Sequence, residues 1–171
     1  ATTTADNNVA VGYNSLGANT TGAKNTAVGT GALESNTTAS FNNAFGFSAL
    51  GANTTGDLNV AIGYEALATN VAGDKSVAVG LQALYTQNPS GNVDMFNTSV
   101  GYQAGYSTTT GTHNTLIGGL AGDAITTGAS NTAVGKDALG ANTTGANNIA
   151  IGSLALDANT TGDHNTSVGT S

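Results

Sequence analysis

The sequence repeats one dipeptide, a large apolar residue followed by glycine, at a nearly constant spacing. Successive glycines of these dipeptides are 17 residues apart, except for one interval of 21 residues between Gly80 and Gly101. A short fixed period is typical of a solenoid, in which each repeat forms one coil and buries its apolar side chains against its neighbours. We therefore expect residues 1–171 to form a single array of ten 17-residue coils with one four-residue insertion. The in-phase ends of the chain suggest a segment of a longer repetitive protein. The ten dipeptides are Val11-Gly12, Val28-Gly29, Phe45-Gly46, Ile62-Gly63, Val79-Gly80, Val100-Gly101, Ile117-Gly118, Val134-Gly135, Ile151-Gly152 and Val168-Gly169.

The residues before each glycine alternate in size, as they do in a β-strand. With the glycine taken as position 0, position −1 is always large and apolar, position −2 is small except at Leu116, and position −3 is β-branched except at Asn43. A period of two places positions −3 and −1 on one face of a strand and position −2 on the other. We expect an all-β fold with a parallel strand from −4 to −1. In this interpretation position −1 fills a thin core, and the small residue at −2 allows close approach of another subunit.

The second half of each coil carries a leucine at position +4 and then a turn sequence. The leucine follows a small residue and predicts a second short strand on the opposite wall. Asn-Thr-Thr-Gly, at 19–22, 53–56, 142–145 and 159–162, predicts the turn into the next coil. Gly105 and Gly122 replace the leucine in the two coils after the insertion, and we expect Tyr106, Leu120 or Ile125 to fill that space. The leucines are Leu16, Leu33, Leu50, Leu67, Leu84, Leu139 and Leu156.

Asparagine recurs at position −4, where only the coil of Ser76 lacks it. Two interpretations are open. Stacked at the strand spacing of ~4.8 Å, these side chains could form an amide ladder along the solenoid. Alternatively, each asparagine only begins the turn of its own coil. The residues are Asn8, Asn25, Asn42, Asn59, Asn97, Asn114, Asn131, Asn148 and Asn165.

The small number of large apolar residues in each coil predicts association between chains. About two such side chains per coil, each contributing roughly 2 kcal/mol when buried, must offset the ordering of a whole coil. A single narrow solenoid therefore looks under-filled. We expect a homo-oligomer, most simply a trimer of solenoids around a common axis.

Composition and charge argue against several classes of function. The chain has a net charge of −7 and only three lysines, too few for the basic surface that nucleic-acid binding needs. It contains no cysteine, and no apolar run is long enough to span a bilayer. The ten acidic residues are scattered, and neither His113 nor His164 has a second ligand at zinc-like spacing. We therefore expect no enzyme activity, no cofactor, no metal and no membrane insertion by this segment.

The repeat resembles a known family through residues 59–66, Asn-Val-Ala-Ile-Gly-Tyr-Glu-Ala, and 76–83, Ser-Val-Ala-Val-Gly-Leu-Gln-Ala. These segments are similar to the head repeats of trimeric autotransporter adhesins, the YadA-like left-handed parallel β-roll, and also to phage tail-fibre and other extracellular fibre repeats. The coils here are longer than the family's usual coil by part of the Asn-Thr-Thr-Gly segment. The resemblance implies a left-handed β-roll and an adhesive or fibrous module outside the cell or on a virion.

The leading hypothesis is a non-enzymatic fibre segment, a rigid rod with a lateral surface for binding or assembly and with end-to-end assembly as a further option. Its partner would be a glycan or a cell-surface receptor. The aromatic residues at position +1 would either bind laterally or cover a seam between subunits: Tyr13, Phe47, Tyr64 and Tyr102. We expect the insertion, residues 87–96, to project as a loop whose contact residues are Met95 and Phe96. Five sequons in the turn are candidate glycosylation sites: Asn19, Asn36, Asn53, Asn142 and Asn159.

An alternative hypothesis is ice binding, because threonine pairs recur in most coils. Regular rows of threonine suit an ice lattice. Against this, adjacent threonines in a strand point to opposite sides, and these pairs precede glycine in an apparent turn. The pairs are 20–21, 37–38, 54–55, 109–110, 126–127, 143–144 and 160–161.

Overall fold

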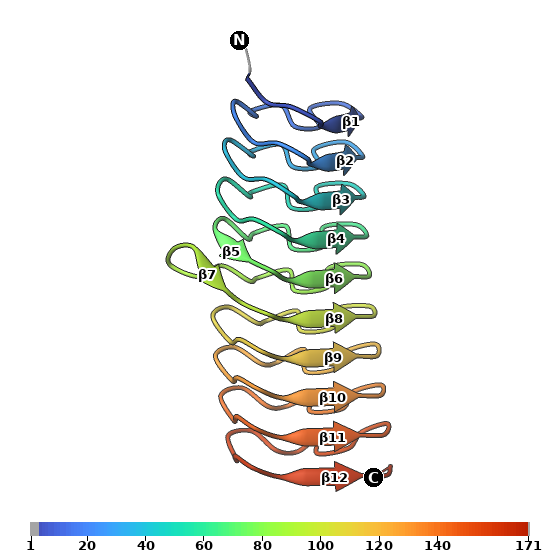
Figure 1. Ribbon diagram of the computed structural model, residues 1–171. Helices are drawn as coiled ribbons and strands as arrows, with labels where there is room; N and C mark the ends of the chain where they lie inside the picture. Colours follow the sequence, from blue (N-terminus) through green and yellow to red (C-terminus); the bar gives the residue numbers. More distant parts are fainter. Residues whose placement is uncertain (1–3, 171) are drawn as a thin grey trace.

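The computed structural model describes residues 4–170, which form one continuous stack of coils (Figure 1). Ten three-residue strands, one from each coil, lie side by side in a parallel sheet of order β1-β2-β3-β4-β6-β8-β9-β10-β11-β12. The described residues contain no helix. The all-β parallel solenoid predicted from the repeat is therefore confirmed. The strands of the sheet are β1 (Val9–Val11), β2 (Thr26–Val28), β3 (Asn43–Phe45), β4 (Val60–Ile62), β6 (Val77–Val79), β8 (Thr98–Val100), β9 (Thr115–Ile117), β10 (Thr132–Val134), β11 (Ile149–Ile151) and β12 (Thr166–Val168).

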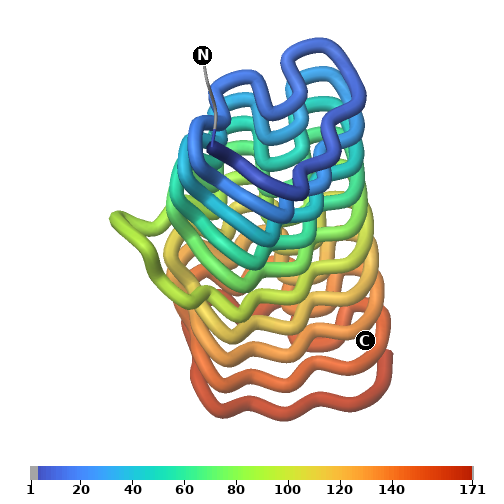
Figure 2. Tube along the Cα trace, turned by 45° about the horizontal axis from the view of Figure 1, so that its top comes forward, coloured from blue at the N-terminus to red at the C-terminus, as the bar shows by residue number. Residues whose placement is uncertain are grey.

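The strand register repeats the sequence period. Val60 pairs with Asn43 on one side and with Val77 on the other, so equivalent positions lie directly above one another. At the insertion, Val77 pairs with Thr98, and the additional residues leave the sheet register unchanged. Figure 2 shows that the coils keep the same outline along the stack. Each residue of a coil thus belongs to a column of equivalent residues that runs along the axis.

The interior of each coil is formed by positions −2, +3 and +4, which reverses our assignment of the two strand faces. In the third coil, Ala44, Ala49 and Leu50 are all fully buried. The large residue at −1 points outward instead: Ile62, for example, is 42% exposed. Alternation shows that two faces differ but not which of them is inside. A narrow coil leaves room for alanine between its two walls, and the bulkier side chain therefore lies outside.

The wall opposite the sheet is a turn and not the second strand that we expected. The leucines at +4 have left-handed backbone angles, with φ near 50° at Leu33 and Leu50. Their side chains point into the core, and the Leu33 N–H donates to Ala49 O of the next coil at 3.0 Å. Coil-to-coil hydrogen bonding therefore continues on this wall without strand geometry. Positions −5 and +2 also have positive φ in most coils, which gives each coil its sharp corners.

The glycine after each strand is required by the close approach of the next coil. At Gly46, φ is 137°, and an added Cβ would lie 2.3 Å from Gly63 O. Both the backbone angle and the lack of space therefore exclude a side chain. This is why the apolar-glycine dipeptide marks every coil.

The insertion is only partly a projecting loop. Gly73–Asp74 (β5) pairs in parallel with Val93–Asp94 (β7), and the segment between Pro89 and β7 bulges from the stack (Figures 1 and 2). Asn92 accepts a hydrogen bond from Thr55 Oγ1 at 2.9 Å, which ties the loop back to an earlier coil. Gln87 and Met95 are fully buried and Pro89 is buried too. The expectation that the whole of residues 87–96 projects is therefore wrong.

The two coils that lack the core leucine are refilled from other positions. An added Cβ at Gly122 would lie 2.8 Å from both Ile125 Cδ1 and Leu116 Cδ2, so these two side chains occupy the missing volume. Both are fully buried. Of the three candidates, Ile125 is confirmed, whereas Tyr106 and Leu120 remain partly exposed. Leu116 was the unrecognised second contributor, although it was the one residue that broke the small-residue rule at −2.

Candidate functional site

Asparagine at position −4 forms a continuous column that links each coil to the next, and we call it the strand column. The Asn42 Oδ1 accepts a hydrogen bond from the Asn59 backbone N–H at 2.9 Å, and its Nδ2 donates to Gly56 O at 2.8 Å. The same pair of contacts recurs along the stack. The ladder interpretation is therefore confirmed, with backbone groups of the next coil as partners. Where Ser76 interrupts the column, its Oγ lies 3.1 Å from the Gln87 Nε2, and the Asn97 Nδ2 donates to the Gln87 Oε1 at 2.9 Å.

A second asparagine column at position +7, the turn column, was not recognised from the sequence as a ladder. Here side chain bonds to side chain: the Asn36 Nδ2 donates to the Asn19 Oδ1 at 2.9 Å, and the Asn53 Nδ2 donates to the Asn36 Oδ1 at 3.2 Å. Gln87 replaces asparagine but continues the column, because its Nε2 donates to the Asn70 Oδ1 at 3.3 Å, and Thr108 and Ile125 then interrupt it. The threonine hydroxyl is buried without a partner in the described part of the chain.

The turn column contains all five candidate glycosylation sites, and their geometry opposes modification. Asn36, Asn53 and Asn142 are fully buried, while Asn19 and Asn159 in outer coils are half-buried. The amide nitrogen that would carry a glycan donates to the carbonyl three residues later in each coil, for example from Asn142 to Gly145 O at 3.0 Å. The turn thus directs these side chains inward and occupies their amide groups.

The threonine pairs divide into a bonded and a free member. At position +8 the hydroxyl donates to the carbonyl of the next coil, as from Thr37 to Thr54 O at 3.1 Å and from Thr126 to Thr143 O at 3.0 Å. The following threonine has no such role in the ladder, and Thr38 and Thr127 are exposed. Only the threonine column at position +9 therefore has hydroxyl groups that do not bond to the next coil, and this weakens the physical basis of the ice-binding alternative.

The largest exposed feature is an apolar surface on the outside of the ten-stranded sheet. We call the columns at −3, −1 and +1 the outer face. The four aromatic residues singled out from the sequence lie on it: Tyr13 is 75%, Phe47 45%, Tyr64 47% and Tyr102 53% exposed. The rings of Phe47 and Tyr64 stack with centroids 5.2 Å apart. The adjacent Glu65 carboxylate raises the pKa of Tyr64 above its ordinary value.

A different edge of the stack, the column at position −5, gathers cations and rings that sequence analysis missed. Lys24 Nζ lies 4.8 Å from the centroid of the Phe41 ring, and Lys75 Nζ lies 5.3 Å from that of Phe96. The Phe96 ring in turn contacts His113, with centroids 5.2 Å apart. Phe96 is 47% exposed, as expected for a contact residue, whereas its neighbour Met95 is fully buried and unavailable for contact. The 17-residue spacing from Lys24 to Phe41 and from Phe96 to His113 was the available signal, although 21 residues separate Lys75 from Phe96 across the insertion.

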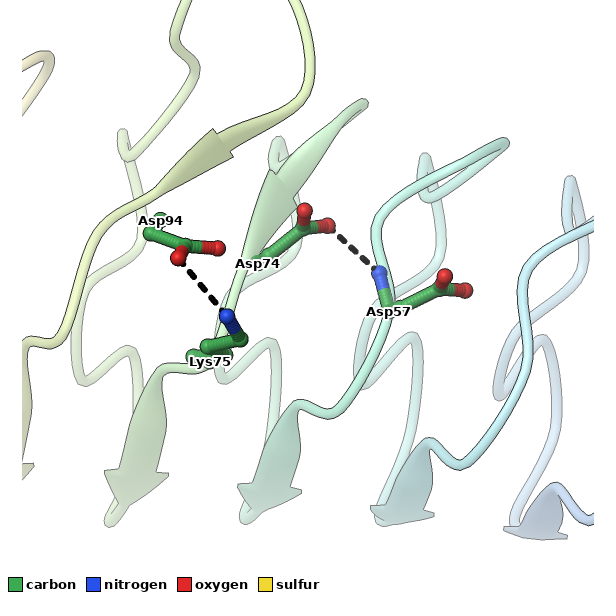
Figure 3. A network of polar contacts seen from close by, with 4 residues as sticks. All are labelled: Asp57, Asp74, Lys75 and Asp94. Atoms are coloured by element: carbon green, nitrogen blue, oxygen red, sulfur yellow. Dashed lines mark hydrogen bonds and ion pairs between the residues drawn. The ribbon is translucent and has the colours of Figure 1, made fainter.

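Acidic side chains beside this edge mainly form hydrogen bonds and ion pairs between neighbouring coils. The Asp74 Oδ1 accepts a hydrogen bond from the Asp57 N–H at 2.7 Å, and Lys75 forms an ion pair with Asp94 at 2.7 Å (Figure 3). Partial burial raises the pKa of Asp74. Within residues 4–170 no group of three histidine, cysteine or acidic residues is placed to hold a metal ion. A shallow open hollow elsewhere contains a single carboxylate. It is lined by Asn14, Gly17, Ala18 and Glu34.

No protein-family model, no curated protein and no solved structure matches the chain. Among the described residues there is no helix long and apolar enough to cross a membrane. The functional argument therefore rests on the ladders and on the exposed surfaces.

Proposed function

We propose that this chain is a structural segment of an extracellular fibre, a non-enzymatic rigid rod that spaces and presents lateral surfaces on a cell or virion. The observation that carries the proposal is the continuity of coil-to-coil hydrogen bonding. Backbone bonds join neighbouring coils at the sheet and at the opposite wall, and the strand column adds two further bonds at most steps. Bending such a stack would break several of these bonds at once.

The dimensions of the rod follow from its coils. Ten coils at a rise of ~4.8 Å give a length of about 45 Å, and further coils of the same kind would lengthen the rod without changing its cross-section. Each coil contacts only its neighbours, as in other solenoids. This is the mechanical property that a spacer in a fibre requires.

The apolar outer face supports lateral association of copies, for which a trimer is the simplest arrangement consistent with the resemblance to trimeric adhesin repeats. From the sequence, the alanine at −2 is the expected subunit contact. Because that alanine is buried within its own coil, the exposed −3, −1 and +1 columns take over this role. The association itself, together with an end-to-end arrangement of segments, belongs to the proposal.

The adhesive part of the function is assigned to the edge at position −5. Exposed rings at Phe41 and Phe96, with Lys24 and Lys75 beside them, offer faces and charged donors to a glycan or a cell-surface receptor. The insertion loop lies next to Phe96, and loops on rigid scaffolds commonly supply specificity.

Duplicating two regular coils, residues 131–164, tests the rod. Small-angle scattering should show the maximum dimension growing by about 10 Å at constant cross-section. A matched variant with the same 34 inserted residues in scrambled order should not lengthen the rod. An unchanged length in the duplicated protein would contradict the proposal. Binding of the unmodified chain to a glycan array or to cells provides the second measurement, and a complete lack of binding would restrict the function to spacing.

A further inference from the structure

The outer face combines large apolar residues at position −1 and aromatic residues at position +1 with a near absence of charge, while threonine and asparagine occupy most of the −3 column. None of the ten carboxylates of the chain lies in the columns at −3, −1 and +1, and Lys136 is the only charged residue there. All ten carboxylates therefore lie in other columns of the rod. Monomeric proteins rarely leave a continuous apolar patch of several hundred Å² in contact with water.

The apolar character is concentrated between the third and sixth coils. Large exposed side chains from neighbouring coils lie next to one another there, and the rings of Phe47 and Tyr64 are stacked on each other. Such a cluster of large apolar and aromatic side chains is the usual centre of a protein interface. Its most exposed members are Phe45, Phe47, Ile62, Tyr64, Leu81 and Tyr102.

We infer that the outer face binds the outer face of a second copy of this chain, with the cluster between the third and sixth coils as the centre of the contact. This inference rests on the proposed function, because it names the surface through which copies in a fibre associate. In a pair of chains the contact packs the exposed faces of two parallel sheets against each other, and in a trimer each face meets those of its two neighbours around the common axis.

The area of the face agrees with what a stable contact needs. Nine steps of ~4.8 Å along the axis and about 13 Å across four residues give roughly 550 Å² on each copy. Two copies would bury about 1,100 Å², which exceeds the roughly 1,000 Å² expected of a specific interface. Because the carboxylates lie in other columns and only Glu65 borders the cluster, beside Tyr64, two chains of like charge can meet here with little direct repulsion.

The periodicity of the face favours a copy of the chain over an unrelated partner. Side chains form rows at one rise per coil, and a second copy carries rows with the same rise. The rows of one copy can therefore fit between those of the other along the full length. A partner without this spacing would lose register after a few coils.

Sedimentation velocity over about 1 to 100 µM protein tests the inference. The unmodified chain should associate, and the Ile62→Thr/Tyr64→Ser variant should weaken association by at least about tenfold. The control Leu154→Asn changes a side chain that is 39% exposed but lies at position +2, outside the outer face, and it should leave association unchanged. Tyr102→Ser serves as a second, milder variant of the face, with the same direction of effect.

Two results would overturn the inference: a monomeric unmodified chain at every concentration, or association that the face variants leave intact. Circular dichroism of each variant shows whether the coils are still folded. The length of the rod, measured by small-angle scattering, does not depend on whether two chains associate. A monomer with the expected length would reject the contact while leaving the rod in place, whereas a wrong length would reject the proposed function itself.

Discussion

The two asparagine columns show how differently the same residue type can act in one solenoid. The strand column at −4 accepts a backbone N–H of the next coil and donates to a carbonyl, as Asn131 does through Asn148 N at 3.0 Å and Gly145 O at 2.9 Å. The asparagines of the turn column at +7 bond chiefly to one another's side chains. They also donate to the same carbonyl that the strand column uses, as Asn142 does to Gly145 O. Asparagine is missing from the first column only at Ser76, and from the second at Gln87, Thr108 and Ile125.

The shared carbonyl explains why one column tolerates interruption. Gly56 O accepts amide protons from both Asn42 and Asn53, so it keeps one bond if the turn column is lost. Gly128 O in the interrupted region accepts only from Asn114 among the hydrogen bonds of the described residues. The backbone N–H that each strand-column oxygen accepts has no such second partner. Replacing the strand column is therefore more damaging than replacing the turn column.

The largest expected effects come from three single substitutions, each of which removes one asparagine side chain from a column. Asn114→Ala leaves both Gly128 O and the Asn131 N–H buried without a partner, and we expect a loss of about 4 kcal/mol of unfolding free energy. Asn42→Ala orphans only the Asn59 N–H and should cost about 2 kcal/mol. Asn53→Ala orphans no backbone group and should cost about 1 kcal/mol. Urea denaturation of the three variants measures this order.

Equal losses at the three positions would show that the shared carbonyl does not decide the difference. As a control for the removal of the side chain itself, Asn147→Ala changes an exposed asparagine outside both columns. Because Asn147 has a φ of 58°, Asn147→Gly is the better-matched version, and its effect should be small.

The repaired core provides the next test of how regular and irregular coils differ. Leu116→Ala alone should cost about 3 kcal/mol, because it empties volume that Gly122 cannot fill. The triple change Leu116→Ala/Gly122→Leu/Ile125→Asn recreates the regular coil and should recover most of that loss. Thermal or urea unfolding measures the coupling between these substitutions. Additive losses would mean that the three residues do not substitute for the missing core leucine.

The smallest effect concerns Asp123, whose pKa is raised by partial burial and by the nearby Asp137. A raised pKa in the folded state means that protonation stabilises the fold. This contribution is fully present below the unfolded pKa of roughly 4 and is lost as the pH rises through the folded pKa. Asp123→Asn should therefore be slightly more stable than the unmodified chain at pH 7 and about equal to it at pH 3. An equal difference in stability at both pH values would contradict this assignment.

Several features of the fold were predictable because they depend on periodicity alone. The spacing of Gly46 and its equivalents predicted the coils, their number and the parallel register, since only a stack places equivalent residues together. Other features depend on backbone angles that carry no clear sequence signal. Leu50 adopts positive φ, which leucine rarely does, and it was therefore taken for a strand residue. For the same reason, Asn36, a candidate glycosylation site by its sequence, is a buried amide in the structure.

By itself, the sequence determined that this chain is a solenoid, where each coil begins, and that the coil of Gly122 needed repair, because these facts follow from which residue types recur and where the recurrence fails. Only the tertiary structure decided which face of the strand is inside. A strand pattern is symmetric with respect to its two faces, and the choice depends on how closely the two walls of a coil approach each other. That distance admits Ala61 and excludes Ile62, and so it places the large apolar residues on the surface where another chain can meet them.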